Sequence, residues 1–265
     1  MTDLALTVAY TLFVWWFATG AILWLDGLPP RTYRYSLGVA SVLLLGAVQL
    51  LSSSADDPSP VGAALAFTAS LAVWGWLEMS FLMGFITGPR RSPCPAGARG
   101  LQRARYALEA VLHHEIALAA GALLVAVVTW EAPNSTGLWT FLILWAMRTS
   151  AKLNVFLGVR NLSESFLPDH LRYLQTYFAR RPMNLLFPWP VIAATTIATL
   201  LWRLAINADD GSHDAVSLGF LATLLSLAVL EHWFLVLPIP ADALWRWGLS
   251  SRRPLDRAPP TTSSS

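Results

Sequence analysis

The chain has 265 residues, of which 55% are hydrophobic and only 13% are charged, and its mean hydropathy is +0.51. Soluble domains carry about 25% charged residues, so the composition excludes a cytosolic enzyme and a disordered regulator, and a net charge of +2 is too small for a nucleic-acid-binding protein. The single cysteine excludes a disulfide framework, whereas the thirteen tryptophans are typical of the interface between membrane and water.

Seven stretches are long and apolar enough to cross a bilayer, for which a helix needs about 20 apolar residues. In chain order they cover residues 4–25, 35–52, 62–86, 106–130, 137–157, 190–207 and 216–237. We therefore predict an all-α integral membrane protein with one bundle of about seven transmembrane helices over residues 1–250. Residues 251–265, rich in Pro, Thr and Ser, are expected to form a disordered cytoplasmic tail.

Positive charges alternate between the connections. Arginines occur at 26–34, 87–105, 158–189 and in the C-terminal tail, whereas the connections at 53–61, 131–136 and 208–215 contain neither arginine nor lysine. Because cytoplasmic loops carry the excess of positive charge, this pattern predicts an N-terminus outside and a C-terminus in the cytoplasm. Only Arg203 lies toward the outer end, inside the sixth span.

The connection at 158–189 is long enough to have structure of its own. Its apolar residues recur at helical spacing, namely Leu167, Leu171, Leu174 and Phe178. This spacing predicts an amphipathic helix on the cytoplasmic membrane surface, and Asp242–Leu249, with its two tryptophans, predicts a second interfacial helix.

Ionisable and polar residues within the spans are the most specific feature of the sequence, because such residues are costly in a membrane and mark functional sites. They are Glu78 in the third span, Glu109, His113, His114 and Glu115 in the fourth, Arg148, Lys152 and Asn154 in the fifth, and Glu231 and His232 in the seventh. At a rise of 1.5 Å per residue, seven of them lie about 5–12 Å from the cytoplasmic ends of their helices, namely Glu78, Glu109, His113, Lys152, Asn154, Glu231 and His232. Four helices therefore place polar groups in one layer of the membrane.

The fourth span suggests which side of a helix faces the bundle. Glu109 and His113 stack on one side, together with the small residues Ala110, Ala117, Ala120 and Gly121. Small residues mark close helix contacts in membranes, so this side is predicted to face inward. Glu115 lies roughly opposite, with Leu108 and Leu118, toward a different neighbour or a partner subunit.

Four interpretations of the polar layer remain open. A metal site, of iron or zinc, would use Glu78, Glu109, His113, Glu231 and His232 as ligands. Di-iron bundles space their ligands as Glu-x-x-His, whereas Glu109 and His113 are one residue further apart. An ion-pair network would neutralise the glutamates with Arg148, Lys152 and histidines. The third interpretation is a tetrapyrrole held by a histidine, and the fourth is a proton pathway.

The run SAKLNVFLGVRNLSESFLPDHL over residues 150–171 closely resembles the PuhE family, also called photosynthetic complex assembly protein 2, of phototrophic proteobacteria. Residues 15–16, 18–20, 23–27 and 113–115 match as well. The resemblance implies a multi-pass protein of the bacterial inner membrane that is encoded with reaction-centre genes. It implies a role in assembling the photosynthetic apparatus or in regulating bacteriochlorophyll supply, with reaction-centre or light-harvesting subunits as partners. It supplies no catalytic residues.

Together these observations predict an assembly factor that binds a tetrapyrrole, such as a bacteriochlorophyll precursor, or a partner subunit in the polar layer. The residues predicted to bind such a cofactor are Arg148, Lys152, Asn154, Arg160, Glu164 and His170. Residues 161–178 would lie beneath the layer as a lid, from which Glu164 and His170 reach up. The alternative is a membrane metal-dependent, di-iron-like oxidoreductase that acts on a tetrapyrrole or an isoprenoid. Membrane lipids are expected partners in either case, and nucleic acid is not.

Overall fold

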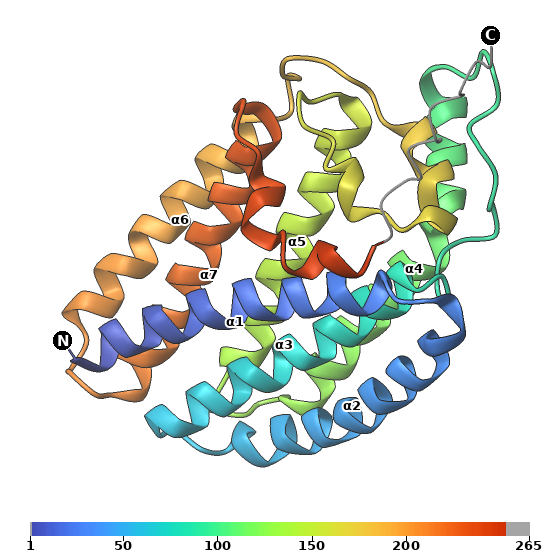
Figure 1. Ribbon diagram of the computed structural model, residues 1–265. Coiled ribbons are helices and arrows are strands. Elements are labelled where there is room, and N and C mark those ends of the chain that lie inside the picture. Colours follow the sequence, from blue (N-terminus) through green and yellow to red (C-terminus); the bar gives the residue numbers. More distant parts are fainter. Residues whose placement is uncertain (1, 253–265) are drawn as a thin grey trace, which may run out of the picture.

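The computed structural model describes residues 2–252, and the secondary structure of this part of the chain consists of helices without strands, as predicted (Figure 1). The long helices are α1 (Thr2–Asp26), α2 (Tyr33–Ala55), α3 (Pro60–Leu82), α4 (Gly100–Val128), α5 (Thr136–Leu157), α6 (Pro188–Asn207) and α7 (His213–Val236). Short 3-10 helices are η1 (Pro30–Thr32), η2 (Glu164–Phe166), η3 (Asp169–Tyr177), η4 (Ala241–Trp245) and η5 (Gly248–Ser251). Most of the predicted tail, residues 253–265, lies outside the described residues.

Six of these helices, all except α5, are long and apolar enough to cross a membrane by length and composition. α5 is 22 residues long, but Arg148, Lys152 and Asn154 make it less apolar. The structure is therefore compatible with a multi-pass membrane protein. Seven spans and the orientation of the termini remain predictions.

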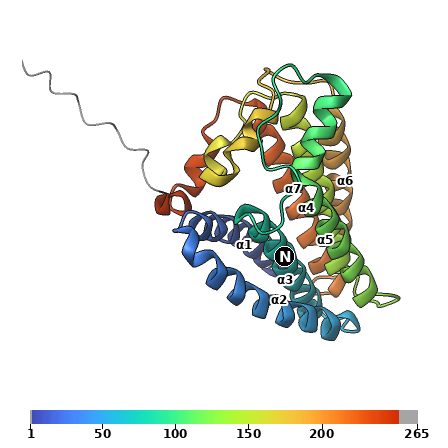
Figure 2. The same cartoon turned by 90° about the vertical axis from the view of Figure 1, so that its right-hand side faces the viewer.

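α3 and α7 form the centre of the bundle, because each packs against at least four of the other long helices. α2 and α6 lie at opposite edges (Figure 2). The rings of Phe67 on α3 and Phe220 on α7 stack with a centroid distance of 4.3 Å, and Tyr10 of α1 packs against both. Serines cap the N-termini of both central helices: Ser59 accepts a hydrogen bond from the Gly62 amide, and Ser212 accepts one from the Ala215 amide.

The segments 158–187 and 237–252 gather at one end of the bundle (Figure 1). The predicted amphipathic α-helix is a 3-10 helix, η3, and its Leu171, Leu174 and Tyr177 are buried against α3 and α4. The apolar side of η3 therefore packs on protein and not on the membrane surface, where it is predicted to lie. The spacing of the leucines indicates one apolar side but does not specify whether lipid or protein covers it. Likewise, the second predicted interfacial helix is η4 and η5, which pack along α1.

Candidate functional site

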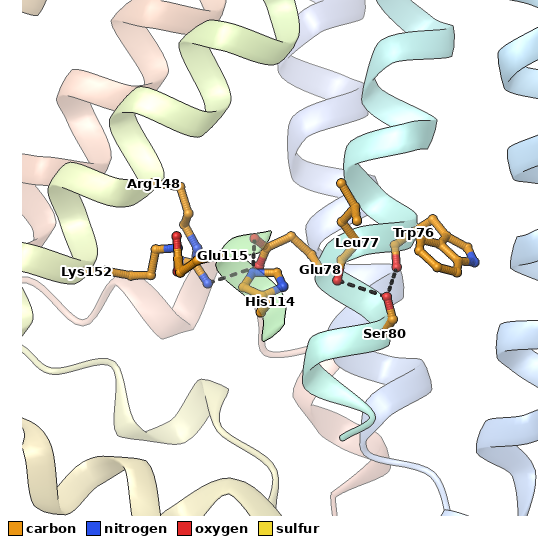
Figure 3. A network of polar contacts seen from close by, with 8 residues as sticks. All are labelled: Trp76, Leu77, Glu78, Ser80, His114, Glu115, Arg148 and Lys152. Carbon is orange, nitrogen blue, oxygen red and sulfur yellow. Dashed lines mark hydrogen bonds and ion pairs between the residues drawn. The ribbon is translucent and has the colours of Figure 1, made fainter. Parts of the chain in front are cut away.

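Charged side chains from α3, α4, α5 and α7 meet inside the bundle. We call Glu78, His114, Glu115, Arg148, Lys152, Glu231 and His232 the charged cluster. Arg148 Nη2 donates a hydrogen bond to Glu78 Oε2 at 3.2 Å, and Lys152 Nζ donates one to Glu115 Oε1 (Figure 3). Ser80 donates to the carbonyl oxygens of Trp76 and Leu77, within the last turns of the helix that carries Glu78. The polar layer predicted from residue depth thus contains two ion pairs, both between neighbouring helices.

His114 approaches the same Glu78 carboxylate as Arg148 (Figure 3). Its Nε2 is 3.7 Å from Glu78 Oε1, and its ring packs on Phe81 with a centroid distance of 4.5 Å. The side chain of His114 is buried, and that of Glu78 is only 10% exposed. Glu78 is therefore enclosed between a cation and an imidazole.

On α7, Glu231 and His232 point to different neighbours. Glu231 Oε1 accepts a hydrogen bond from Trp15 Nε1 of α1 at 2.6 Å, and its charge also interacts with that of Arg148. His232 Nδ1 is 2.8 Å from the Ala228 carbonyl oxygen, so Nδ1 donates and Nε2 accepts from Ser150 Oγ at 2.9 Å. With both ring nitrogens in use, His232 has none left for a metal ion.

Arg148 is the most accessible cation of the cluster. Its side chain is 47% exposed, although it shares one side of α5 with the fully buried Phe141. The outward side of α5 is marked by Ala146, Leu153 and Leu157, all exposed. Because Arg148 lies opposite these residues, its half-exposed side chain faces the interior of the bundle, where water or a polar ligand can reach it.

The predicted inward side of α4 is wrong by about one residue. Ala110, His114, Leu118 and Val125 are buried, whereas His113 is exposed. Of the small residues on the predicted side, Ala110 and Gly121 are buried but Ala120 is exposed, and the lipid-facing surface of a membrane helix is apolar too. Glu115 pairs with Lys152 of α5, so the different neighbour that it is predicted to contact is this helix.

The five predicted metal ligands do not form one group. Glu109 pairs with Arg105 at 2.8 Å, one helical turn away, on a largely exposed surface. Within residues 2–252, no three histidine, cysteine, aspartate or glutamate side chains come close enough together to hold a metal ion. The pairs Glu78–Arg148 and Glu115–Lys152 match the predicted ion-pair network instead.

The residues predicted to bind a cofactor are also divided. Arg148 and Lys152 belong to the charged cluster, but Asn154 is fully buried, and its Oδ1 accepts a hydrogen bond from Asn184 at 2.9 Å. Asn184 also bonds to the carbonyl oxygen of Gly158 and thus closes the end of α5. Asn154 therefore holds the fold together.

Residues 161–178 do cover this end of the bundle, but they do not reach into the cluster. Glu164 pairs with Arg180 at 3.0 Å on the surface, and Arg160 is exposed. His170 packs against Gly84 and Tyr33. The predicted upward reach of Glu164 and His170 is wrong because each has a nearer partner in a loop, and loop contacts cannot be read from helical spacing.

Sequence reasoning does not identify two partners of the cluster, namely Trp15, which bonds to Glu231, and Ser150, which bonds to His232. A tryptophan or a serine gives no distinct signal inside a membrane span, where both commonly serve packing. Glu115 belongs to the predicted polar layer, but its partner Lys152 is not identified from the sequence.

The pKa of His170 is lowered from its ordinary value of 6.5, mainly by burial of part of the ring and further by the charges of Arg252 and Arg91. The Leu82 carbonyl and Asp169 act in the opposite direction. The unfolded chain therefore takes up this proton first, and the free energy of unfolding is expected to fall as the pH drops below 6.5. His170→Gln should flatten the dependence of Tm on pH between pH 8 and 5 in detergent. Equal slopes for the two proteins would contradict the prediction.

Comparisons with known proteins add a family. The family described as "Protein of unknown function (DUF3623)" matches residues 1–256. A Rhodobacter capsulatus protein described as "Uncharacterized 30.4 kDa protein in puhA 5'region" is 43% identical over 247 residues, which cover 91% of this chain and 89% of that protein. No solved structure matches the chain significantly.

Proposed function

Because the chain belongs to the DUF3623 family and its Rhodobacter relative lies beside puhA, we propose that it is an assembly factor of the photosynthetic apparatus in the bacterial inner membrane. The gene puhA is a photosynthesis gene, so the neighbourhood of the relative suggests a photosynthetic role. The similarity is consistent with the resemblance to the PuhE family. The six apolar helices agree with a membrane location.

The proposed binding site rests on one residue, Arg148. Its side chain is half exposed on the inward side of α5, and only one of its hydrogen-bond donors is used within residues 2–252, by Glu78. An arginine carries five N–H donors, and unused donors among apolar helices require a polar partner. We propose that this partner is an acidic group of a tetrapyrrole or of a partner subunit, which would bind during assembly.

The oxidoreductase alternative is less well supported, because the five proposed ligands do not come together within residues 2–252. His232 uses both ring nitrogens, and Glu109 pairs with Arg105. A tetrapyrrole or subunit contact needs only the accessible cation, Arg148. We therefore propose binding, not redox chemistry, as the function.

The proposal is tested in a phototrophic host whose own gene is deleted and replaced by variants. Arg148→Gln should reduce the near-infrared absorption of the reaction-centre and light-harvesting complexes several-fold, while pigment intermediates remain in balance. Arg148→Lys should retain part of the function. Arg34→Gln, at an exposed site outside the cluster, is the matched control.

Immunoblots of the variant protein must show normal amounts for this comparison to hold. Accumulation of one defined tetrapyrrole intermediate in the Arg148→Gln strain would favour the oxidoreductase alternative and contradict the proposal. Normal complexes in the deletion strain would contradict a role in assembly altogether.

A further inference from the structure

A groove runs along the outward surface of α6, on the side of the bundle away from α2. Its volume is about 580 Å³, and its walls extend from Val191 to Arg203 on α6, with Trp233 of α7 beside them. A smaller hollow of about 160 Å³ continues it between α6 and α7 and shares Thr195 and Thr199 with it. The residues of the charged cluster do not line either hollow.

The groove is apolar despite its threonines. Thr196 Oγ1 donates to the Ile192 carbonyl at 2.9 Å, and Thr199 Oγ1 donates to the Thr195 carbonyl at 2.8 Å. Because these hydroxyl groups bond to their own helix, the threonines offer their methyl groups to an occupant. Ile192 and Leu200, both exposed, extend this apolar surface.

Arg203 is the cation of the groove. Its side chain is exposed, and the guanidinium has no ion pair within residues 2–252. It lies four residues before the end of α6, roughly 6 Å along the axis, at the end of the bundle whose connections contain no other arginine or lysine. An unpaired cation in an otherwise apolar, lipid-facing surface requires an anionic partner.

We propose that this groove binds an anionic phospholipid of the bilayer. The phosphate would pair with Arg203, and one acyl chain would lie along the threonine methyl groups toward Trp233. The groove spans thirteen residues of α6, from Val191 to Arg203, or roughly 18 Å, a length suited to an acyl chain. A guanidinium binds phosphate through two parallel hydrogen bonds. This inference is independent of the proposed function.

Charge alone would not hold a free phosphate ion at this place. Asp209 and Asp214 follow shortly after the helix and repel anions. The acyl chain must therefore contribute to binding, which distinguishes a lipid from a soluble anion.

The test uses the full chain, purified in mild detergent and stripped of lipid. Tm is measured against phosphatidylglycerol, phosphatidylcholine with the same acyl chains, and inorganic phosphate. Phosphatidylglycerol should raise Tm in a saturable way, and the other two should not. Arg203→Gln should weaken the apparent affinity for phosphatidylglycerol about tenfold, the effect of one charged hydrogen-bonded contact. Arg203→Lys should retain most of the affinity, and Arg34→Gln all of it.

Thr199→Phe fills the groove while Arg203 remains, so it should abolish the response to phosphatidylglycerol without changing the oligomeric state. The proposal is overturned if phosphatidylglycerol stabilises Arg203→Gln as well as the parent, or if phosphatidylcholine or inorganic phosphate is equally effective. A dimer that Thr199→Phe dissociates would assign the groove to a second copy of the chain, and would overturn the proposal too.

Discussion

Replacing Glu78 by Gln is expected to lower the free energy of unfolding by about 3 kcal/mol, because it removes one partner of an enclosed ion pair. Glu78 is 8% exposed and lies between Arg148 and His114. Without the carboxylate, Arg148 keeps its charge among apolar helices and loses its 3.2 Å ion pair with Glu78. Because the side chain of Arg148 is half exposed, the expected loss in the free energy of unfolding lies at the lower end of the range for a broken buried ion pair.

The measurement is thermal or denaturant unfolding in detergent, carried out as a double-mutant cycle with Arg148→Gln. The double variant should lose less than the sum of the two single variants, since it leaves no unpaired charge. Glu164→Gln is the matched control, because its pair with Arg180 is exposed on both sides and should matter by less than about 0.5 kcal/mol. A Glu78→Gln protein as stable as the parent would show that the ion pair does not hold the helices together.

The positions of the helices could be predicted because long apolar runs alternate with short polar breaks. All seven predicted stretches correspond to helices, with boundaries shifted by a few residues. α3 ends at Leu82 rather than near residue 86, because Gly84 takes a positive φ of 80° in the turn that follows. α4 begins at Gly100, six residues early, because its first turns contain arginines and extend beyond the apolar run.

The contacts within the site were less predictable. Depth along the helices placed Glu78, Arg148, Lys152 and Glu231 at one level, and the structure brings them together. Depth does not determine how a helix is rotated, since both lipid and bundle accept apolar residues. The rotation of α4 about its axis decides which of its side chains contact the neighbouring helices. It brings Glu115 to Lys152, and it brings His114, not His113, to Glu78.

Residues 237–252, which we call the C-terminal strap, pack along α1, and at one point the two backbones are in direct contact. Trp245 Nε1 donates to the Trp16 carbonyl at 3.0 Å, and Trp16 Nε1 donates to the Leu244 carbonyl at 2.9 Å. At the end of the strap, Arg252 Nη2 donates to Asp26 Oδ1 at 2.8 Å, and the side chain of Asp26 is fully buried. Between these contacts, Gly248 lies directly on Gly20.

Gly248→Ala is expected to detach the strap, because the added Cβ would lie 2.4 Å from the Gly20 carbonyl oxygen. The obstacle is backbone within a helix and cannot rotate away, so the strap must move. Overpacking of this kind costs about 1–3 kcal/mol. The expected result is a lower Tm together with faster tryptic cleavage after Arg246 and Arg252.

Gly46→Ala is the matched control, because a Cβ at that position in α2 meets no atom within 4 Å. It should leave cleavage unchanged and stabilise the helix by up to about 1 kcal/mol.

The C-terminal strap also contacts the charged cluster through tryptophans. Trp245 packs on Trp15 with a centroid distance of 5.0 Å, and Trp15 donates a hydrogen bond to Glu231. Gly248→Ala should therefore reduce photosynthetic complexes along with Arg148→Gln if the cluster is the binding site. Normal amounts of photosynthetic complexes with a detached strap would show that the function of the charged cluster does not depend on the strap. An unchanged rate of tryptic cleavage would contradict the predicted clash at Gly248 itself.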